Sequence, residues 1–301
     1  MSKIKSISAE LMERLDWLVY LGDLFSSYKK NKNDQFHSII KKAVNQNAWF
    51  TEKNIYTSIH YWQCKLKIEN LNTWISNYEI TRMQPVKVGI VMAGNFPFAG
   101  LHDLICVIIS GNIAIVKTSR SDKVLIDYLI DYIWSKFPIS KHYIIKSEIL
   151  KEFDKVIATG SNNTFRYFEY YFKKKPAILR KSRTSVAILE NNTDKDSLRL
   201  LAKDIFTYFG LGCRNVSKLF VPIGFDLKKL ICAFDEFEQI KFHHKYYNNL
   251  NYYKTIKILN NEKFIDGEFF LMSKSKKFTP PISEIYYEFY SNKKDLIKYL
   301  K

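Results

Sequence analysis

The stretch that decides the fold is Val86-Lys87-Val88-Gly89-Ile90-Val91-Met92, which is followed directly by the turn Ala93-Gly94-Asn95-Phe96-Pro97. It is short, rich in β-branched residues and nearly continuously apolar, as is typical of a strand buried on both faces. An apolar helix is expected from Ala99 to Ser110, and a second buried strand over residues 112–117. Strand, glycine turn, helix and strand in this order predict a parallel sheet with helices on both faces.

The same alternation continues along the chain. Upstream, residues 7–78 carry apolar side chains at helical spacing and predict several helices, the first of them capped by Ser8. After residue 222 the pattern indicates strands and helices without defined limits. The other predicted elements are strands at 155–159, 184–189 and 218–222 and helices at 123–135, from about 164, and at 197–208. The fold class predicted from this alternation is therefore α/β.

Length and composition narrow the class of protein. The chain has 301 residues, 47% of them hydrophobic and 16% aromatic, which excludes a disordered or collagen-like chain. It holds no run of about 20 apolar residues, and its charged start, Met1–Ser8, lacks the apolar core of a secretory signal. We therefore expect no membrane span, a cytoplasmic location, and reduced cysteines whose spacing fits neither disulfides nor a zinc site.

Lys and Arg outnumber Asp and Glu by 47 to 30, which gives a formal net charge of +17. Such a charge fits a polyanionic partner, either nucleic acid or a phosphorylated substrate. It also fits a general bias toward Lys, Asn, Ile, Tyr and Phe, in which basic runs such as Tyr28–Lys32 and Lys173–Lys175 are solvated surfaces. We favour the second interpretation and expect no nucleic-acid partner. A nucleic-acid-binding protein, whose association would weaken steeply with salt, stays open as a different class of function.

Glycines mark the candidate binding edge. Seven of the 10 glycines lie between positions 89 and 212, mostly where strands end. Glycine permits sharp turns and a close approach of backbone to a ligand, and open α/β sheets bind ligands at the carboxyl ends of their strands. Neither of the common glycine motifs for phosphate binding is present. The strand-end loops that remain are Gly94–Pro97, Gly111–Arg120, Ala158–Ser161 and Gly210–Asn215.

In this order, the four loops resemble those of the aldehyde dehydrogenase superfamily, and more closely those of its acyl-CoA reductase branch, the LuxC-like long-chain fatty acyl-CoA reductases. The resemblance implies an aldehyde dehydrogenase-like α/β fold with a Rossmann-type parallel sheet. It divides the chain into a helical N-terminal region (1–84), an NADP-binding Rossmann-like domain on which that region packs (85–182), and a shortened catalytic domain (183–301). The likeness covers about residues 85–294, most fully over 88–119, 154–172 and 180–222, and more weakly at Phe278–Pro281.

Cys213 is the candidate nucleophile. By itself, a cysteine after a helix is well explained by a buried packing role. The flanking glycines let the backbone close on a substrate, and Arg214 with nearby Lys218 makes a cationic neighbourhood that favours the thiolate. The resemblance implies that Cys213 is the catalytic cysteine. The other cysteines lie in ordinary helical or apolar runs and are expected to have packing roles: Cys64, Cys106 and Cys232.

Asn95 follows the first predicted strand at a glycine. As a turn residue, it would tolerate unusual backbone angles. As a functional residue, its amide would donate to the oxyanion that forms when a thiolate attacks a carbonyl. The resemblance implies the second role, with the backbone N–H of Cys213 as the other donor.

The resemblance also implies residues that bind a nicotinamide cofactor. Lys117 matches a lysine that binds the adenosine ribose, and Ser119 lies in the same loop. Arg120 stands where many NAD-using relatives carry Glu. Because a guanidinium pairs with a 2′-phosphate that a carboxylate would repel, we expect NADPH rather than NADH. Gly160 and Ser161 match the loop and helix start that pass the pyrophosphate, although they also fit an ordinary turn with a serine cap.

Three departures from the family pattern matter. Ile178–Arg183 stands where hydrolytic aldehyde dehydrogenases carry a general-base Glu, and it holds no carboxylate, which favours a reductase over oxidation of aldehyde to acid. Lys276 replaces a Glu that usually holds the nicotinamide ribose, which leaves Phe278 as the expected nicotinamide neighbour. The sequence ends at Lys301, earlier than relatives do, so the second domain and its oligomer contact are expected to be shortened or absent.

The histidines are few and scattered. His102 and Asp103 follow Asn95 on the predicted helix and either line the cleft or pack at the helix surface, which is the interpretation we favour. His243 and His244 have no carboxylate or cysteine at ligand spacing, so no metal site is expected.

The sequence therefore predicts an acyl-CoA reductase that uses NADPH to reduce a fatty acyl-CoA, long-chain in the LuxC-like case, to the aldehyde through an acyl-cysteine. The expected partner is acyl-CoA, and a homo-oligomer is a further option. A short-chain CoA-acylating aldehyde dehydrogenase that works in the oxidative direction also stays open, as does an inactive relative kept as a binding subunit.

Overall fold

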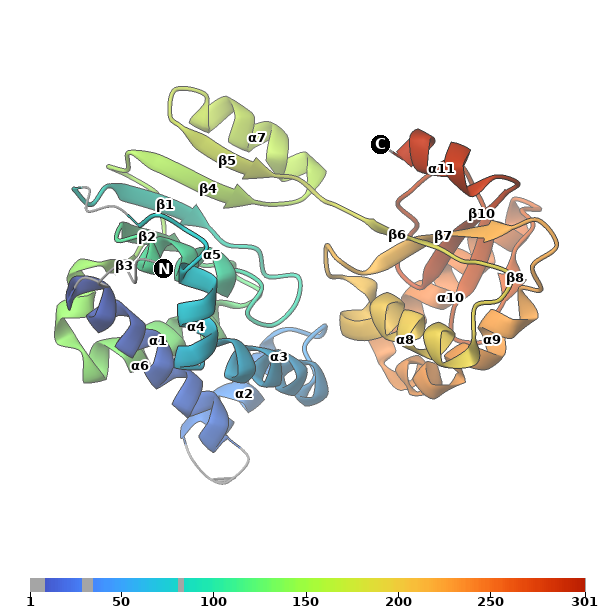
Figure 1. Cartoon of the computed structure of the whole chain (residues 1–301). Coiled ribbons are helices and arrows are strands. Elements are labelled where there is room, and N and C mark those ends of the chain that lie inside the picture. The colour runs from blue at the N-terminus through green and yellow to red at the C-terminus, as the bar shows by residue number, and fades with distance from the viewer. Residues whose placement is uncertain (1–8, 29–34, 81–83, 301) are drawn as a thin grey trace. The chain divides into compact units, whose positions relative to one another are not determined.

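The computed structural model describes residues 9–28, 35–80 and 84–300. The chain divides into two compact units, residues 1–182 and 183–301, and each contains a five-stranded sheet (Figure 1). The predicted cap Ser8 and residues 29–32 of the first basic run lie outside the described residues.

The first unit joins a helical N-terminal part to a parallel sheet, and the strands predicted around 86–92, 112–117 and 155–159 are all present. Its strands are β1 (Lys87–Val91), β2 (Ile113–Lys117), β3 (Ile144–Lys146), β4 (Lys155–Thr159) and β5 (Ala177–Arg180). Its helices are α1 (Ala9–Ser27), α2 (Gln35–Gln46), α3 (Glu52–Lys65), α4 (Ile68–Ile75), α5 (Leu101–Ile109), α6 (Lys123–Lys136), the 3₁₀ helix η1 (Pro138–His142) and α7 (Asn162–Phe172).

The five strands of this first sheet run parallel in the order β3-β2-β1-β4-β5. The apolar stretch quoted at the outset becomes β1 at the centre, where Ile90 is fully buried. One core is formed with helices α1 to α6, and a smaller one with α7 through Phe168. The strand order reverses between β1 and β4. Open α/β sheets bind ligands at such a reversal, in the crevice at the carboxyl ends of the two strands.

Helix α5 is held at its carboxyl end by a buried arginine of α1. The Arg14 guanidinium donates to the carbonyls of Ile108, Gly111 and Asn112, each at 3.1 Å, and lies 4.3 Å from the centre of the Tyr143 ring. Carbonyls at a helix carboxyl end lack partners within the helix, and a cation there is favourable. Arg14 thus fixes the helix that follows the Asn95 turn.

The second unit has a mixed sheet in the order β6-β7-β10-β9-β8, in which β8 and β9 are antiparallel and the other pairs are parallel. Phenylalanine rings fill its core, with Phe206 in contact with Phe234, Phe269 and Phe270. Its strands are β6 (Ser185–Ile188), β7 (Val216–Pro222), β8 (Ile265–Asp266), β9 (Leu271–Lys274) and β10 (Glu284–Tyr290). Its helices are α8 (Lys195–Phe206), α9 (Lys228–Phe234), α10 (His244–Leu259), α11 (Lys293–Leu300) and the 3₁₀ helices η2 (Thr207–Gly210) and η3 (Asp235–Phe242).

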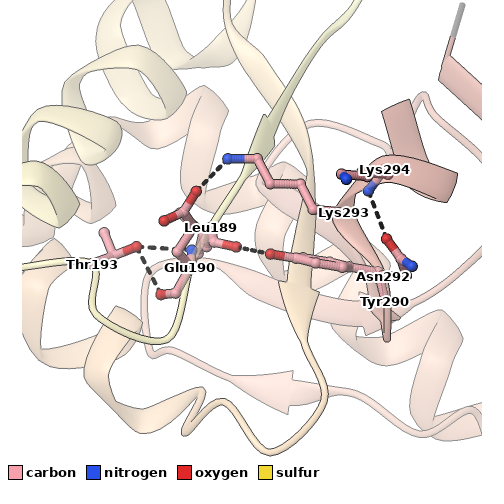
Figure 2. Close-up of polar contacts among 7 residues, drawn as sticks. All are labelled: Leu189, Glu190, Thr193, Tyr290, Asn292, Lys293 and Lys294. Carbon is pink, nitrogen blue, oxygen red and sulfur yellow. Dashed lines mark hydrogen bonds and ion pairs between the residues drawn. The ribbon is translucent and has the colours of Figure 1, made fainter. Parts of the chain in front are cut away.

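Polar contacts join the carboxyl ends of β6 and β10 (Figure 2). The Tyr290 hydroxyl donates to the Leu189 carbonyl at 2.5 Å, and Lys293 forms an ion pair with Glu190. The Thr193 hydroxyl accepts from the Glu190 N–H at 2.9 Å and donates to the carbonyl of the same residue at 2.8 Å. Because β7 lies between β6 and β10, these contacts stabilise the sheet on both sides of the strand that follows Cys213.

Candidate active site

The turn after β1 and the loop after β2 touch each other. A Cβ on Gly94 would lie 2.4 Å from Ser119 Oγ, so a larger residue at position 94 would displace that loop. The Met92 N–H also donates to the Lys117 carbonyl at 3.0 Å. The structure therefore brings the predicted residues Lys117 and Ser119 to the turn on which Asn95 is exposed.

A buried aspartate that the sequence did not reveal joins these two loops from inside. Asp122 Oδ2 accepts from the Phe98 N–H at 2.9 Å, and Phe98 has a left-handed φ of 60°. Burial raises the pKa of Asp122 well above its ordinary value. Its other oxygen, Oδ1, has no hydrogen-bond partner in the part of the chain that the structure describes. This carboxyl group fixes the turn that carries Asn95.

A group of mixed charge stands at the carboxyl end of β2. Lys117 and Arg120 are exposed there, and Lys123 forms an ion pair with Glu148 at 2.9 Å. The ammonium of Lys123, with help from Lys117 and Arg120, lowers the pKa of Glu148. Glu148 was not predicted as a site residue, because it follows the three-residue strand β3. A carboxylate suits a ribose 2′-hydroxyl and a guanidinium suits a 2′-phosphate, so this edge holds one group of each kind.

At the carboxyl end of β4, Gly160 lies against α7. A Cβ there would approach Phe168 Cε2 to 2.9 Å and Thr164 Cβ to 3.0 Å. Ser161 is the N-cap of α7, and its Oγ accepts from the Thr164 N–H at 3.2 Å. The serine hydroxyl therefore serves the helix, and the N–H groups of the first turn are what α7 offers to an anion.

The polar groups at the carboxyl ends of β2 and β4 fit a nicotinamide dinucleotide. The N–H groups of a helix that follows a glycine turn suit a pyrophosphate, and cationic and hydroxyl side chains suit a ribose or its phosphate. The Thr159 hydroxyl, at the end of β4, is buried and has no partner within the described residues. A buried polar group of this kind is a donor or acceptor that a ligand can satisfy.

In the second unit, Cys213 lies on a strained loop between α8 and β7. Tyr208, Phe209 and Gly210 have successive left-handed φ values of 55°, 59° and 74°. Residues other than glycine rarely adopt this conformation, and such strain persists where the surroundings fix it, often at functional sites. Cys213 is exposed, which a nucleophile that meets a substrate requires.

Asn215 fixes this loop. Its Oδ1 accepts from the Gly212 N–H at 2.7 Å, and its Nδ2 donates to the carbonyls of Asp204 at 2.7 Å and Thr207 at 3.0 Å. Asn215 thereby ties the backbone on both sides of Cys213 to the end of α8. Among the described residues, no hydrogen bond uses the backbone N–H of Cys213, so that N–H can donate to a ligand oxygen.

Lys218 does not have the role expected from the sequence, which was to favour a Cys213 thiolate together with Arg214. Its side chain is fully buried, and its ammonium pairs with Glu288 at 2.6 Å. It also donates to the backbone carbonyls at 275 and 276, at 3.0 and 3.2 Å. Glu288 neutralises the cation, and of the two expected cations only Arg214 is exposed.

The same lysine holds Phe278, the expected nicotinamide neighbour. Its ammonium lies 4.7 Å from the centre of the Phe278 ring and 4.7 Å from that of Phe220. Ser217 Oγ donates to the Phe278 carbonyl at 2.9 Å. Since Ser217 and Lys218 belong to β7, the segment that carries Phe278 is fastened to the strand that follows the Cys213 loop.

A carboxylate from another part of the chain lies beside the segment 178–183. The sequence of this segment alone gave no sign of it. Arg180 of β5 pairs with Asp103 of α5 at 2.6 Å. Burial disfavours the ionised form of Asp103, but His102 and Arg180 outweigh it and lower its pKa. An ionised carboxylate held by a guanidinium is a weak base for activating water, so this pair does not replace the missing general base.

Two cysteines expected to pack do not. Cys64 on α3 and Cys232 on α9 are exposed, whereas Cys106 on α5 is partly buried with its Sγ 3.7 Å from His102 Nδ1. Within the described residues, no three His, Cys, Asp or Glu side chains are grouped to hold a metal ion. In the same part of the chain, no helix combines the length and apolar character that a membrane crossing requires.

Comparison with known proteins covers both units. The family described as Acyl-CoA reductase (LuxC) matches residues 69–228, from α4 to the first residue of α9. This stretch includes the loops that carry Asn95, Lys117, Gly160 and Cys213. Among curated proteins, none is similar enough to the chain to count as a match.

Several solved structures similar to this chain are aldehyde dehydrogenases. One from Mycobacterium tuberculosis, complexed with NAD+, has a TM-score of 0.65 and 14% identity over 96% of this chain and 70% of its own. The NAD+ complex from Bacillus cereus has a TM-score of 0.66 and 14% identity over 99% and 70%. KauB from Pseudomonas aeruginosa has a TM-score of 0.68 and 12% identity over 97% and 69%. At this identity the likeness establishes the fold, and the expected aldehyde dehydrogenase-like α/β fold is confirmed.

Proposed function

The chain belongs to the LuxC family of acyl-CoA reductases, and on this basis we propose that it reduces a long-chain fatty acyl-CoA to the fatty aldehyde with NADPH as reductant. The observation that carries the proposal is the Cys213 loop, in which an exposed thiol sits on backbone that is strained at 208–210 and fixed by Asn215. We assign residues 85–182 as the cofactor domain and 183–301 as the catalytic domain.

In the first step, the Cys213 thiolate attacks the thioester carbonyl carbon. A bond forms between this sulfur and the acyl carbon, the bond to the sulfur of CoA breaks, and CoA leaves as the thiolate. The backbone N–H of Cys213 is proposed as one donor to the oxyanion and the Asn95 amide as the other. One such donor is worth about 3–4 kcal/mol of barrier.

The acyl-cysteine is expected to survive until it is reduced. Hydrolysis would need a base that activates water, and the segment 178–183 supplies none. The carboxylate beside it, Asp103, is ionised and paired with Arg180. These residues therefore support a reductase rather than an enzyme that forms a free acid.

Residues at the first sheet's carboxyl edge are proposed to bind the cofactor. Lys117, Ser119 and Arg120 would hold its adenosine side, and Gly160 with the first-turn N–H groups behind Ser161 would hold the pyrophosphate. When bound, the cofactor supplies the hydride that reduces the acyl thioester to the aldehyde level.

Phe278 is proposed to lie against the nicotinamide. The packing of its segment on β7, through Ser217 and Lys218, supports a fixed position for the ring. Arg120 favours NADPH. The Glu148 carboxylate near it is the observation that favours NADH instead, and the two cofactors can be compared directly.

The test is NADPH consumption by the purified chain with hexadecanoyl-CoA, with the aldehyde product quantified. We expect one aldehyde for each NADPH oxidised, and Cys213→Ser should reduce the rate to background. Cys232→Ser is the matched control, because Cys232 is another exposed cysteine of the same unit; it should keep the wild-type rate. Equal rates in the wild-type chain and Cys213→Ser would end the proposal.

A further inference from the structure

The first unit contains an apolar pocket that the proposed reaction does not use. It has a volume of about 540 Å³ and is lined mainly by α4, by residues 78–80, 84 and 86, and by α5. That volume lies within the range of small-molecule sites, which are mostly apolar. The titratable residues Glu79, His102 and Lys155 on its lining are all exposed, and most of the other lining residues are apolar. The apolar residues that line it are Trp74, Ile75, Tyr78, Ile80, Val86 and Ile109.

A thiol and an imidazole share one wall of this pocket. Cys106 and His102 are one helical turn apart on α5, and both line it. The Cys106 Sγ lies 3.7 Å from His102 Nδ1 and 4.0 Å from Nε2. The Trp74 ring lies 5.7 Å from the imidazole, centre to centre, on the facing helix α4. A nucleophilic atom therefore faces a space lined by hydrocarbon and aromatic rings.

Charged groups surround the imidazole of this pair. The carboxylate of Asp103, together with Cys106, raises the pKa of His102 to about 9. Asp103 lies 3.8 Å from the imidazole and is itself held by Arg180 at 2.6 Å. The imidazole is therefore cationic near neutral pH and can donate a hydrogen bond beside the Cys106 sulfur.

We propose that this pocket binds a fatty acyl chain and that Cys106 is S-acylated there by fatty acyl-CoA; the choice of acyl donor rests on the proposed function. The Cys106 sulfur attacks the thioester carbonyl, its bond to the acyl carbon forms, and the bond from that carbon to the CoA sulfur breaks. The thiol proton ends on CoA. Neither sulfur changes its oxidation state, so no oxidant or reductant is needed.

The chain contains its own controls for this reaction. Cys64 and Cys232 are more exposed than Cys106, so a reagent that reacts by access alone modifies them first. If the less accessible Cys106 reacts selectively, the cause is binding of the acyl chain in the pocket and the neighbouring His102 imidazole. Selectivity among the three thiols is therefore the quantity to measure.

The experiment uses the full-length Cys213→Ser variant, which cannot form the proposed catalytic intermediate. It is mixed with hexadecanoyl-CoA at pH 7.5 without cofactor and followed by intact mass and peptide mapping. We expect one acyl group on Cys106, removable by hydroxylamine, and none after the further change Cys106→Ser. His102→Gln should slow the reaction about tenfold or more.

Chain length and pocket shape give two further readouts. Burying one more methylene contributes about 0.8 kcal/mol, so each should speed acylation about fourfold until the pocket is full. Ser110→Trp should block the pocket, because Ser110 lines it. Ser135→Trp is the matched control, since both serines lie at a helix carboxyl end and donate to the carbonyl three residues earlier. It should leave the rate unchanged.

Acylation of Cys64 or Cys232 as fast as Cys106, or no acylation of Cys106, would overturn the inference. So would a Cys106 rate that is insensitive to both His102→Gln and chain length. Failure of the proposed reductase function is seen separately, as the absence of NADPH consumption by the wild-type chain. The Cys106→Ser variant should keep that consumption, because Cys106 takes no part in the proposed reduction.

Discussion

The ammonium of Lys218 lies 2.6 Å from a carboxylate oxygen of Glu288, and the lysine side chain is fully buried while that of Glu288 is 29% exposed. Replacing Lys218 by Met would leave Glu288 and two backbone carbonyls without their cation. Removing one partner of a buried pair costs about 3–5 kcal/mol, and we expect the lower end because Glu288 is partly exposed. Urea unfolding of the purified chain measures this loss.

A matched control for this variant is Lys293→Met. Lys293 pairs with Glu190, but both side chains are half exposed, so we expect no measurable change in the urea midpoint. The double variant Lys218→Met with Glu288→Leu removes both charges and should recover part of the lost stability. If Lys218→Met unfolds at the wild-type midpoint, the buried lysine does not hold this unit together.

The raised pKa of Asp122 predicts a pH dependence of stability. The contribution of Asp122 to the free energy of unfolding is full at pH values below the pKa of this carboxyl group in the unfolded chain, about 3.9. It is lost as the pH rises toward the higher pKa of the folded state. Asp122→Asn keeps an acceptor for the Phe98 N–H and does not titrate. The difference in free energy of unfolding should therefore move in favour of the variant between pH 4 and 7. Denaturant unfolding at several pH values measures it, and a constant difference would contradict the buried acid.

The Asn215 side chain should control the rate of the chemical step. Asn215→Ala removes the bonds that tie the Cys213 loop to α8, and small misplacements of a reacting group cost up to about a hundredfold in rate. Asn215→Asp keeps the acceptor for the Gly212 N–H and should lose less. We expect kcat to fall with KM for acyl-CoA little changed. A fall in kcat that only follows loss of folded protein, measured by circular dichroism, would speak against a positioning role.

Arg120 and Glu148 test the cofactor preference. Arg120→Glu should raise KM for NADPH about tenfold or more and change KM for NADH less, because it replaces the expected partner of a 2′-phosphate by a repelling carboxylate. Glu148→Gln should weaken NADH binding if that carboxylate accepts from the ribose hydroxyl. The KM values for NADPH and for NADH, measured for each variant, test the cofactor preference. Equal changes for both cofactors in Arg120→Glu would remove the argument for NADPH.

The sequence predicted the order of elements well where burial is complete. The strands around Ile90, Val116 and Val156 are continuous apolar runs, because a central parallel strand is covered on both faces. β3 and β5 were missed: the first has only three residues, and the second has no buried residue, so neither has a distinctive pattern. The limits of the helices and strands in the last third of the chain could not be predicted for a related reason. β8 has two residues, and β10 mixes buried and partly exposed positions.

Site residues divide in the same way. Candidate positions in a glycine-containing turn after a strand, such as Asn95 and Gly160, can be proposed from the sequence, and their roles stay predictions. Asp122 could not, because before a helix it looks like an ordinary N-cap, whereas in the structure it makes no cap bond and holds the Phe98 turn. Lys218 was misjudged because nearness to Cys213 in the chain does not show where the ammonium goes. Its strand carries the ammonium to Glu288, 70 residues further on.

The central claim, a covalent acyl-enzyme on Cys213, is tested most directly by the mass of the wild-type chain after mixing with hexadecanoyl-CoA in the absence of NADPH. We predict an acyl thioester on Cys213, located by peptide mapping, that added NADPH discharges as the aldehyde. The separate acyl group expected on Cys106 should persist after NADPH is added. A Cys213 that stays unmodified, or carries an acyl group that NADPH does not remove, would contradict it.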